Sequence, residues 1–316
     1  DGKMAVFHID NPYTPITLWW DEITLYKSLV ENSDYYIAKN QSKEAIFHKD
    51  NPNEPISNWW TDVILAGLWK GKSEYYVVEQ NGQMAIFHKD NPNEPISQWW
   101  DWIIPDGLIM GESDYYIVQR EDFQHAIFHK DNADKPISQW WKYIHLHGLL
   151  IGESEYYIVQ DDREKKAIFH KDNPNQPISQ WWYKIHKEGL LEGKSEYYIV
   201  QQQSKEAIFH IDNPNESISK WHDYVLPSGL INNTSECYAV ANNSAIQVYH
   251  WANPIQPLYE LSDVHQNTLL YFNDQIAIYL TKQHLMLYNN IYKEHYILGE
   301  LSEQIKPLVD EIHQGS

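Results

Sequence analysis

The residues of this sequence best suited to chemistry are histidines, each followed two positions later by an aspartate. His48 and Asp50 form one such His-x-Asp pair. A histidine beside a carboxylate is typical of a metal site, or of a general base that an acid orients. The six histidines of these pairs are His8, His48, His88, His129, His170 and His210.

A catalytic centre needs one such constellation, whereas this chain repeats the pair six times. We therefore expect a structural histidine, and an aspartate that serves a turn or a helix cap. Metal binding is the alternative role of the pair, but the sequence predicts no metal site and no catalytic residue.

Other motifs of catalysis or cofactor binding are missing from the sequence. It has no glycine-rich phosphate loop, no Gly-x-Ser-x-Gly elbow and no His-Glu-x-x-His zinc motif. The single cysteine, Cys237, excludes an intrachain disulfide and a cysteine zinc cluster. We therefore predict a protein that is not an enzyme and needs no cofactor.

The elements that position the histidines recur at a fixed interval. The segment Ala-Ile-Phe-His-Lys-Asp-Asn begins at Ala45 and returns every 40 or 41 residues, with Ile211 in place of lysine in its last clear copy. Such a period is the signature of tandem repeats that stack on one another. We expect six repeats over 1–244, at approximately 1–43, 44–83, 84–124, 125–165, 166–205 and 206–244. A degenerate seventh repeat and a C-terminal cap then occupy 245–316.

Within each repeat, the pattern Ile-x-x-Trp-Trp-x-x-Ile predicts a helix. Ile96, Trp99, Trp100 and Ile103 lie at i, i+3, i+4 and i+7, which is one stripe of a helix. A preceding proline suits a first helical turn, and a later glycine suits a C-terminal cap. We expect the first tryptophan of each pair in the core.

The rest of the repeat predicts a β-hairpin. Tyr-Tyr-Ile-Val, as at 156–159, and Ala-Ile-Phe-His are rich in strand-forming residues and are separated by a polar turn. The predicted fold class is therefore an α/β (α+β) tandem-repeat solenoid of six to seven strand-turn-strand-helix units. A six- or seven-bladed β-propeller is the alternative. The cap is expected to hold a hairpin at 275–288 and a helix around 300–313.

Three sets of residues are candidates for binding a partner. The first tyrosine of each pair would form an outward row, and residues that vary between repeats would add contacts at the helix edge and at the hairpin turns. Arginine and aromatic residues are enriched in binding hot spots. The predicted partner-binding residues are Tyr75, Tyr115, Tyr156 and Tyr197 in the row, Trp102 and Tyr143 beside the helix, and Arg120, Phe123 and Arg163 in the turns.

The charge of the chain restricts its partners. A formal net charge of -20 repels nucleic acid and attracts a basic protein. The sequence has no apolar run long enough to span a membrane, so we expect a soluble protein, with a cytoplasmic location slightly favoured over secretion.

The predicted function is multivalent protein binding, with an inhibitor or immunity-type protein for a basic partner as a special case. Carbohydrate binding by exposed tyrosine and tryptophan faces is the alternative, with a glycan as the ligand.

Overall fold

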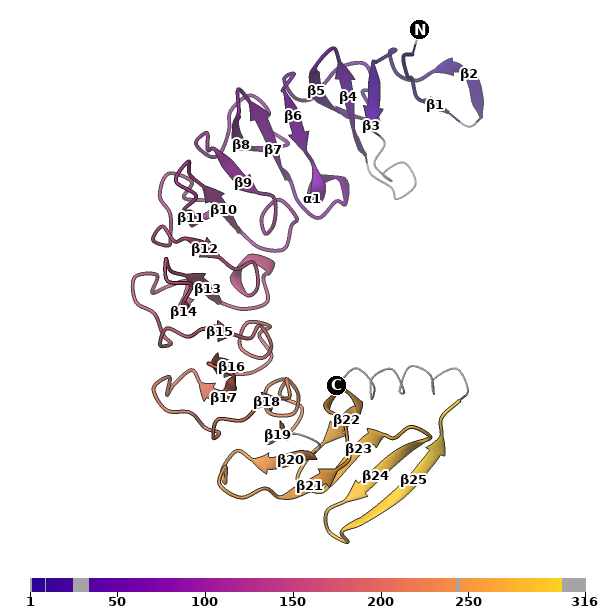
Figure 1. The fold of residues 1–316 in the computed structure, drawn as a ribbon. Coiled ribbons are helices and arrows are strands. Elements are labelled where there is room, and N and C mark those ends of the chain that lie inside the picture. The colour runs from indigo at the N-terminus through magenta and orange to yellow at the C-terminus, as the bar shows by residue number, and fades with distance from the viewer. Residues whose placement is uncertain (1, 9, 25–33, 243–244, 303–316) are drawn as a thin grey trace. The chain divides into compact units, whose positions relative to one another are not determined.

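The structure, a computed structural model, describes residues 2–8, 10–24, 34–242 and 245–302. The regular secondary structure of these residues consists almost entirely of short β-strands (Figure 1). The chain divides into two compact units: the first is Asp1–Gly152 with Lys171–Asn175, and the second is Glu153–His170 with Gln176–Ser316.

The recurring element of both units is an antiparallel hairpin, as the Tyr-Tyr and Ala-Ile-Phe-His segments predicted. In the hairpin of β7 and β8, Tyr75 pairs with His88, Tyr76 with Phe87 and Val77 with Ile86. The hairpins of the first unit are β4 (Tyr35–Asn40) with β5 (Lys43–His48), β7 (Tyr75–Gln80) with β8 (Gln83–His88), and β10 (Tyr115–Gln119) with β11 (His125–His129). Those of the second unit are β13 (Tyr156–Gln160) with β14 (Lys166–His170), β16 (Tyr197–Gln202) with β17 (Lys205–His210), and β19 (Cys237–Asn242) with β20 (Ala245–His250).

The predicted Trp-Trp helix is wrong, because this segment is extended. Trp60 forms a β-bridge with Glu44 through two backbone hydrogen bonds of 2.8 Å, and the strand that follows pairs with β7. The equivalent short strands are β3 (Glu22–Thr24), β6 (Asp62–Ile64), β9 (Trp102–Ile104), β12 (Tyr143–Ile144), β15 (Lys184–Ile185) and β18 (Tyr224–Val225). In the described residues, the single α-helix is the four-residue α1 (Ala66–Trp69).

The α/β solenoid is therefore incorrect, and the fold class is all-β. Each hairpin belongs to its own small antiparallel sheet, such as β6-β7-β8 in the first unit and β15-β16-β17 in the second. One small sheet per repeat is the local arrangement that the β-propeller alternative predicts. The repeat boundaries proposed from the sequence fall at the end of each hairpin turn or after the first residue of the strand that follows it, so that each sheet draws strands from two consecutive intervals.

The apolar spacing misled the prediction because the two tryptophans serve two different partners. Trp99 packs edge-on against Phe87 of its own hairpin, with ring centroids 6.2 Å apart, whereas Trp100 packs against Phe128 of the next hairpin at 5.2 Å. Neighbouring residues of an extended chain point to opposite sides. The first tryptophan of each pair is half-buried or exposed. The second is buried in two copies, Trp20 and Trp182.

A buried hydroxyl holds the extended segment against its hairpin. Ser97 accepts a hydrogen bond from the Ile86 amide and donates one to the Gln98 carbonyl, both at 2.9 Å. A neighbouring bond joins the Ile96 amide to the Ile86 carbonyl at 2.8 Å. The equivalent hydroxyls are Thr17, Ser57, Ser138, Ser179 and Ser219.

We expect Ser97→Ala to lower the free energy of unfolding by about 1–3 kcal/mol, because the buried Ile86 amide loses its acceptor. Ser97→Thr is the matched control, since Thr17 makes the same bond in the first repeat, from Val6 at 3.0 Å. Urea denaturation measures the loss, and hydrogen exchange at the Ile86 amide locates it. Equal stability of the alanine and threonine variants would contradict this role of the hydroxyl.

Consecutive repeats approach each other closely at a glycine in three of the loops that precede hairpins, at Gly111, Gly152 and Gly193. Gly111 has a φ of +74°, and a Cβ built on it would lie 2.0 Å from the Lys72 carbonyl oxygen of the preceding loop. Beside this contact, Ser73 donates to the Leu108 carbonyl at 2.8 Å. Equivalent serine bonds join Ser113 to Leu150 in the first unit and Ser195 to Ile231 in the second.

Gly111→Ala should therefore separate two consecutive loops and lower the free energy of unfolding by about 3 kcal/mol or more. Gly82→Ala provides the comparison, because Gly82 has a similar φ of +77° but nothing within 4 Å of the place that a Cβ would take. The free energy of unfolding of that variant should fall by only about 1 kcal/mol, because the alanine is strained at this φ. Equal losses in urea denaturation would show that the close approach contributes nothing.

The C-terminal part of the second unit departs from the repeat. β21 (Tyr259–Ser262) joins the sheet of β18, β19 and β20, while β22 (Leu269–Phe272), β23 (Ile276–Leu280), β24 (His284–Asn289) and β25 (Glu294–Glu300) form a sheet of their own. The predicted hairpin at 275–288 is confirmed by the pairing of β23 with β24. The predicted helix around 300–313 falls almost wholly on residues outside those described.

The remaining elements are short. They are β1 (Phe7–His8), β2 (Asn11–Pro15), η1 (Leu149–Ile151) and η2 (Gln266–Thr268). Of the helices in the described ranges, none has the length and apolar character needed to cross a membrane.

Candidate functional site

The predicted tyrosine row is half-buried instead of projecting into solvent. Tyr75 meets the His88 ring edge-on, with centroids 5.0 Å apart, and Tyr156 and Tyr197 make the same contact with His170 and His210. Tyr115 occupies the equivalent place against His129. The row therefore lines a surface whose other residues come from neighbouring loops.

The recurring histidine makes a hydrogen bond to the backbone of the turn that follows it. His88 accepts a hydrogen bond at Nδ1 from the Asp90 amide at 3.2 Å, which leaves the proton of the neutral ring on Nε2, 3.4 Å from a Glu74 carboxylate oxygen. The aspartate thus contributes its backbone to a turn, and it caps no helix. One copy has the composition of a metal site, because ligand atoms of Glu196, His210 and Asp212 lie within 4.8 Å of one another.

The two variable aromatic residues lie on short strands, not beside a helix. Trp102 begins β9 and is 47% exposed, and Tyr143 begins β12 and is 41% exposed. Tyr143 also meets the His125 ring edge-on at 5.6 Å. Both side chains are partly available to a partner.

The three candidate residues of the hairpin turns differ in their surroundings. Arg120 is held by two side chains: its guanidinium lies 4.1 Å from the Trp140 ring centroid and bonds to Asp122 at 2.8 Å. Phe123 is 73% exposed at the turn and has a φ of +60°. Arg163 is exposed as well. Phe123 and Arg163 are therefore better placed for a partner than Arg120 is.

We expect Arg120→Gln to lower the free energy of unfolding by about 1 kcal/mol, because it removes a cation–π contact and a surface ion pair. Arg163→Gln is the control and should change it by less than about 0.5 kcal/mol. Urea denaturation of the two variants tests the difference. A larger loss in the Arg163 variant would mean that the arginine roles are reversed.

The structure also shows a recurring groove that the sequence did not predict. We call it a junction groove: its walls are the first tyrosine of one hairpin and the loop of the next repeat that ends in Ser-Glu. The Lys89 groove, in the first unit, is lined by Tyr35, Leu68, Gly71, Lys72, Ser73, Glu74 and Lys89. The Ile211 groove, in the second unit, is lined by Tyr156, Leu190, Gly193, Lys194, Ser195 and Glu196, with Ser154, Glu155, Tyr197 and Asn233. The Trp251 groove is lined by Tyr197, Leu230, Asn233, Thr234, Ser235, Glu236 and Trp251.

The three grooves are equivalent in position but differ in size. The Lys89 groove encloses about 180 Å³, whereas the Ile211 and Trp251 grooves enclose about 490 and 460 Å³. The position after the repeated histidine, which gives each groove its name, changes from lysine to isoleucine to tryptophan. The two larger grooves share Tyr197 and Asn233, so they form a continuous surface on the second unit.

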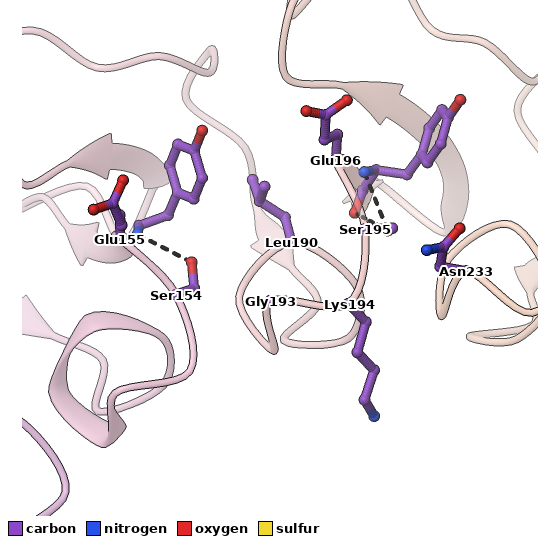
Figure 2. Close-up of a pocket in the computed structure, with 10 residues that line it drawn as sticks. Ser154, Glu155, Leu190, Gly193, Lys194, Ser195, Glu196 and Asn233 are labelled. Carbon is purple, nitrogen blue, oxygen red and sulfur yellow. Dashed lines mark hydrogen bonds between the residues drawn. The ribbon is translucent and has the colours of Figure 1, made fainter.

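The Ile211 groove is acidic. Glu155 and Glu196 both line it, and the Lys194 side chain points away from them (Figure 2). Lys194 instead pairs with Glu192 at 2.8 Å. Burial, followed by the charge of Glu196, raises the pKa of the Tyr156 and Tyr197 hydroxyls, so both remain neutral at physiological pH.

No protein-family model matches this chain, and no curated protein matches it in sequence. Similar solved structures include Hsv2 from Kluyveromyces lactis, with 8% identity, a TM-score of 0.33, and 86% of this chain and 95% of that chain covered. A eukaryotic initiation factor shows 9% identity and a TM-score of 0.36 over 86% of this chain and 74% of its own. The computationally designed protein Ika8 shows 6% identity and a TM-score of 0.33, with 85% and 84% covered. Similarity this weak identifies neither a family nor a function.

Proposed function

We propose that this tandem-repeat protein is a non-enzymatic, multivalent protein-binding module whose partner is basic. The observation that supports the proposal most directly is the repetition of junction grooves lined by tyrosines and carboxylates. Tyrosine provides a large contact area at a small loss of side-chain entropy, and a carboxylate selects a positive group. Grooves repeated along one chain add their contributions through multivalency.

The charge of the whole chain supports the same proposal. A net charge of -20 raises the association rate of a positively charged protein at low salt. An inhibitor or immunity-type protein that neutralises a basic effector is the special case in which the partner is toxic or catalytic. Glycan binding by the exposed aromatic residues is the alternative outcome of the test.

The test is to capture proteins on the immobilised chain at low salt and to elute them with rising salt. We expect to capture a basic protein. When this protein is purified, its dissociation constant should rise with ionic strength, because salt screens the attraction. The double variant Tyr156→Ala/Tyr197→Ala should weaken its binding by about tenfold or more, the effect of losing one or two hot-spot residues. Tyr13→Ala is the control, because Tyr13 is 92% exposed and lies outside the three grooves.

Two results would contradict the proposal. Affinity that is independent of salt would remove the electrostatic part, and equal binding by the wild type and the double tyrosine variant would remove the groove. If the chain retains no protein but a glycan array gives a signal that the tyrosine variant loses, carbohydrate binding replaces protein binding.

A further inference from the structure

We propose that the Ile211 and Trp251 grooves each bind the ammonium group of a lysine side chain from the partner. The inference rests on the proposed function and names the chemistry of recognition. It comes from comparing equivalent positions of successive repeats, because one repeat shows the groove filled and two show it open.

In the first unit, the chain fills the groove with its own lysine. Lys89 lines the groove together with Tyr35, and its Nζ lies 3.1 Å from a carboxylate oxygen of Glu74. The hydrogen bond from Lys89 is the largest cause of the lowered pKa of Glu74, and the hydrogen bond from His88 is the next largest. In the next repeat, Lys130 makes the same pair with Asp114 at 2.8 Å. The groove therefore accommodates an alkylammonium group between a carboxylate and a tyrosine.

In two repeats of the second unit, the carboxylate remains but the lysine does not. Glu196 and Glu236 occupy the place of Glu74, while Ile211 and Trp251 occupy the place of Lys89. Each carboxylate keeps its histidine contact, 3.2 Å from His210 and 3.1 Å from His250. The histidine therefore takes one position around each carboxylate, and the residue that supplies the ammonium in the Lys89 groove is replaced by isoleucine or tryptophan.

The size of the open grooves agrees with a side chain supplied by a partner. Both enclose more than twice the volume of the groove that Lys89 fills. Trp251 adds a ring that is 43% exposed, and a cation over a tryptophan face is attracted to it. Because the two grooves are continuous through Tyr197 and Asn233, one partner segment with two lysines can enter both.

A bound divalent cation would give a different pattern. The set of Glu196, His210 and Asp212 has the composition to hold a metal ion, but the Trp251 groove has Ala252 where the other has Asp212. Metal binding therefore predicts one occupied groove, whereas ammonium binding predicts two. The two explanations also differ in their response to a chelator.

The experiment titrates the full chain with a hexalysine peptide that has blocked termini, by isothermal titration calorimetry at low salt and with EDTA present. The double variant Ile211→Lys/Trp251→Lys places the chain's own lysine in both grooves. We expect binding to weaken on the order of tenfold or more, the effect of losing a charge-assisted contact in each groove. Lysine stands at this position in four other repeats, at Lys49, Lys89, Lys130 and Lys171, so the substitution is compatible with the fold.

Two matched controls separate the groove from the net charge and from folding. Tyr13→Lys/Ile297→Lys adds the same two charges at exposed positions away from the grooves, and should leave most of the affinity intact. Lys89→Ile copies the residue of the Ile211 groove into the first unit. It should open a further site and raise the number of hexalysine peptides bound, which a misfolded variant would not do.

Equal weakening by both double-lysine variants would overturn the inference, as would a Lys89→Ile variant with unchanged binding. Loss of the wild-type signal in EDTA would assign the groove to a metal ion instead. The inference and the proposed function fail separately. If a basic protein is captured and released by salt but binds the Ile211→Lys/Trp251→Lys variant with full affinity, only the lysine grooves are wrong. If hexalysine binds as described and no protein is captured, only the proposed function is wrong.

Discussion

The structure depends on one buried aromatic residue in each of the six repeat hairpins, a phenylalanine in five of them and Tyr249 in the last, and on the rings that surround it. Phe87 stacks on Tyr76 of its own hairpin at 5.8 Å, meets Trp99 edge-on at 6.2 Å, and receives Trp60 from the preceding segment at 5.2 Å. Because one of these contacts comes from the neighbouring repeat, a single hairpin cannot complete its own core. Stacking is therefore a condition of folding here and not an addition to it.

This aromatic packing decides which parts of the repeat are free to vary. The tyrosine, the phenylalanine and the second tryptophan fill fixed space, and the loops between hairpins are tied by serine hydroxyls to the next repeat. The position directly after the repeated histidine lies at the edge of this framework. It accepts lysine, isoleucine or tryptophan without disturbing the hairpin, as Lys89, Ile211 and Trp251 show. A rigid framework thus presents a replaceable residue, which lines the groove at Lys89 and at Trp251.

The sequence predicted the hairpins correctly, because strand-forming residues on both sides of a polar turn strongly favour a β-hairpin. The helix prediction was wrong at Trp99 and Trp100. Their spacing fits one stripe of a helix, but it also fits an extended chain whose two faces contact two different hairpins. Periodicity alone cannot separate these cases, since both bury the same residues. The grooves were beyond prediction for another reason: Tyr156, Glu196 and Asn233 come from three separate segments. Only the loss of lysine at Ile211 and at Trp251 was visible in the sequence, as breaks in the repeated motif.

Net charge alone does not locate a binding surface on this chain, because many of its carboxylates are already paired. Where lysine follows the histidine, as at Lys89 and Lys130, the repeat neutralises its own groove. At Ile211 and Trp251 it does not, so the carboxylate beside the tyrosine keeps its negative charge uncompensated by lysine, in a cavity large enough to admit a side chain. Near-identical repeats thereby acquire different roles through one substitution each. The functional positions of such a chain are those where a repeat loses the lysine that would neutralise a carboxylate but keeps the carboxylate itself.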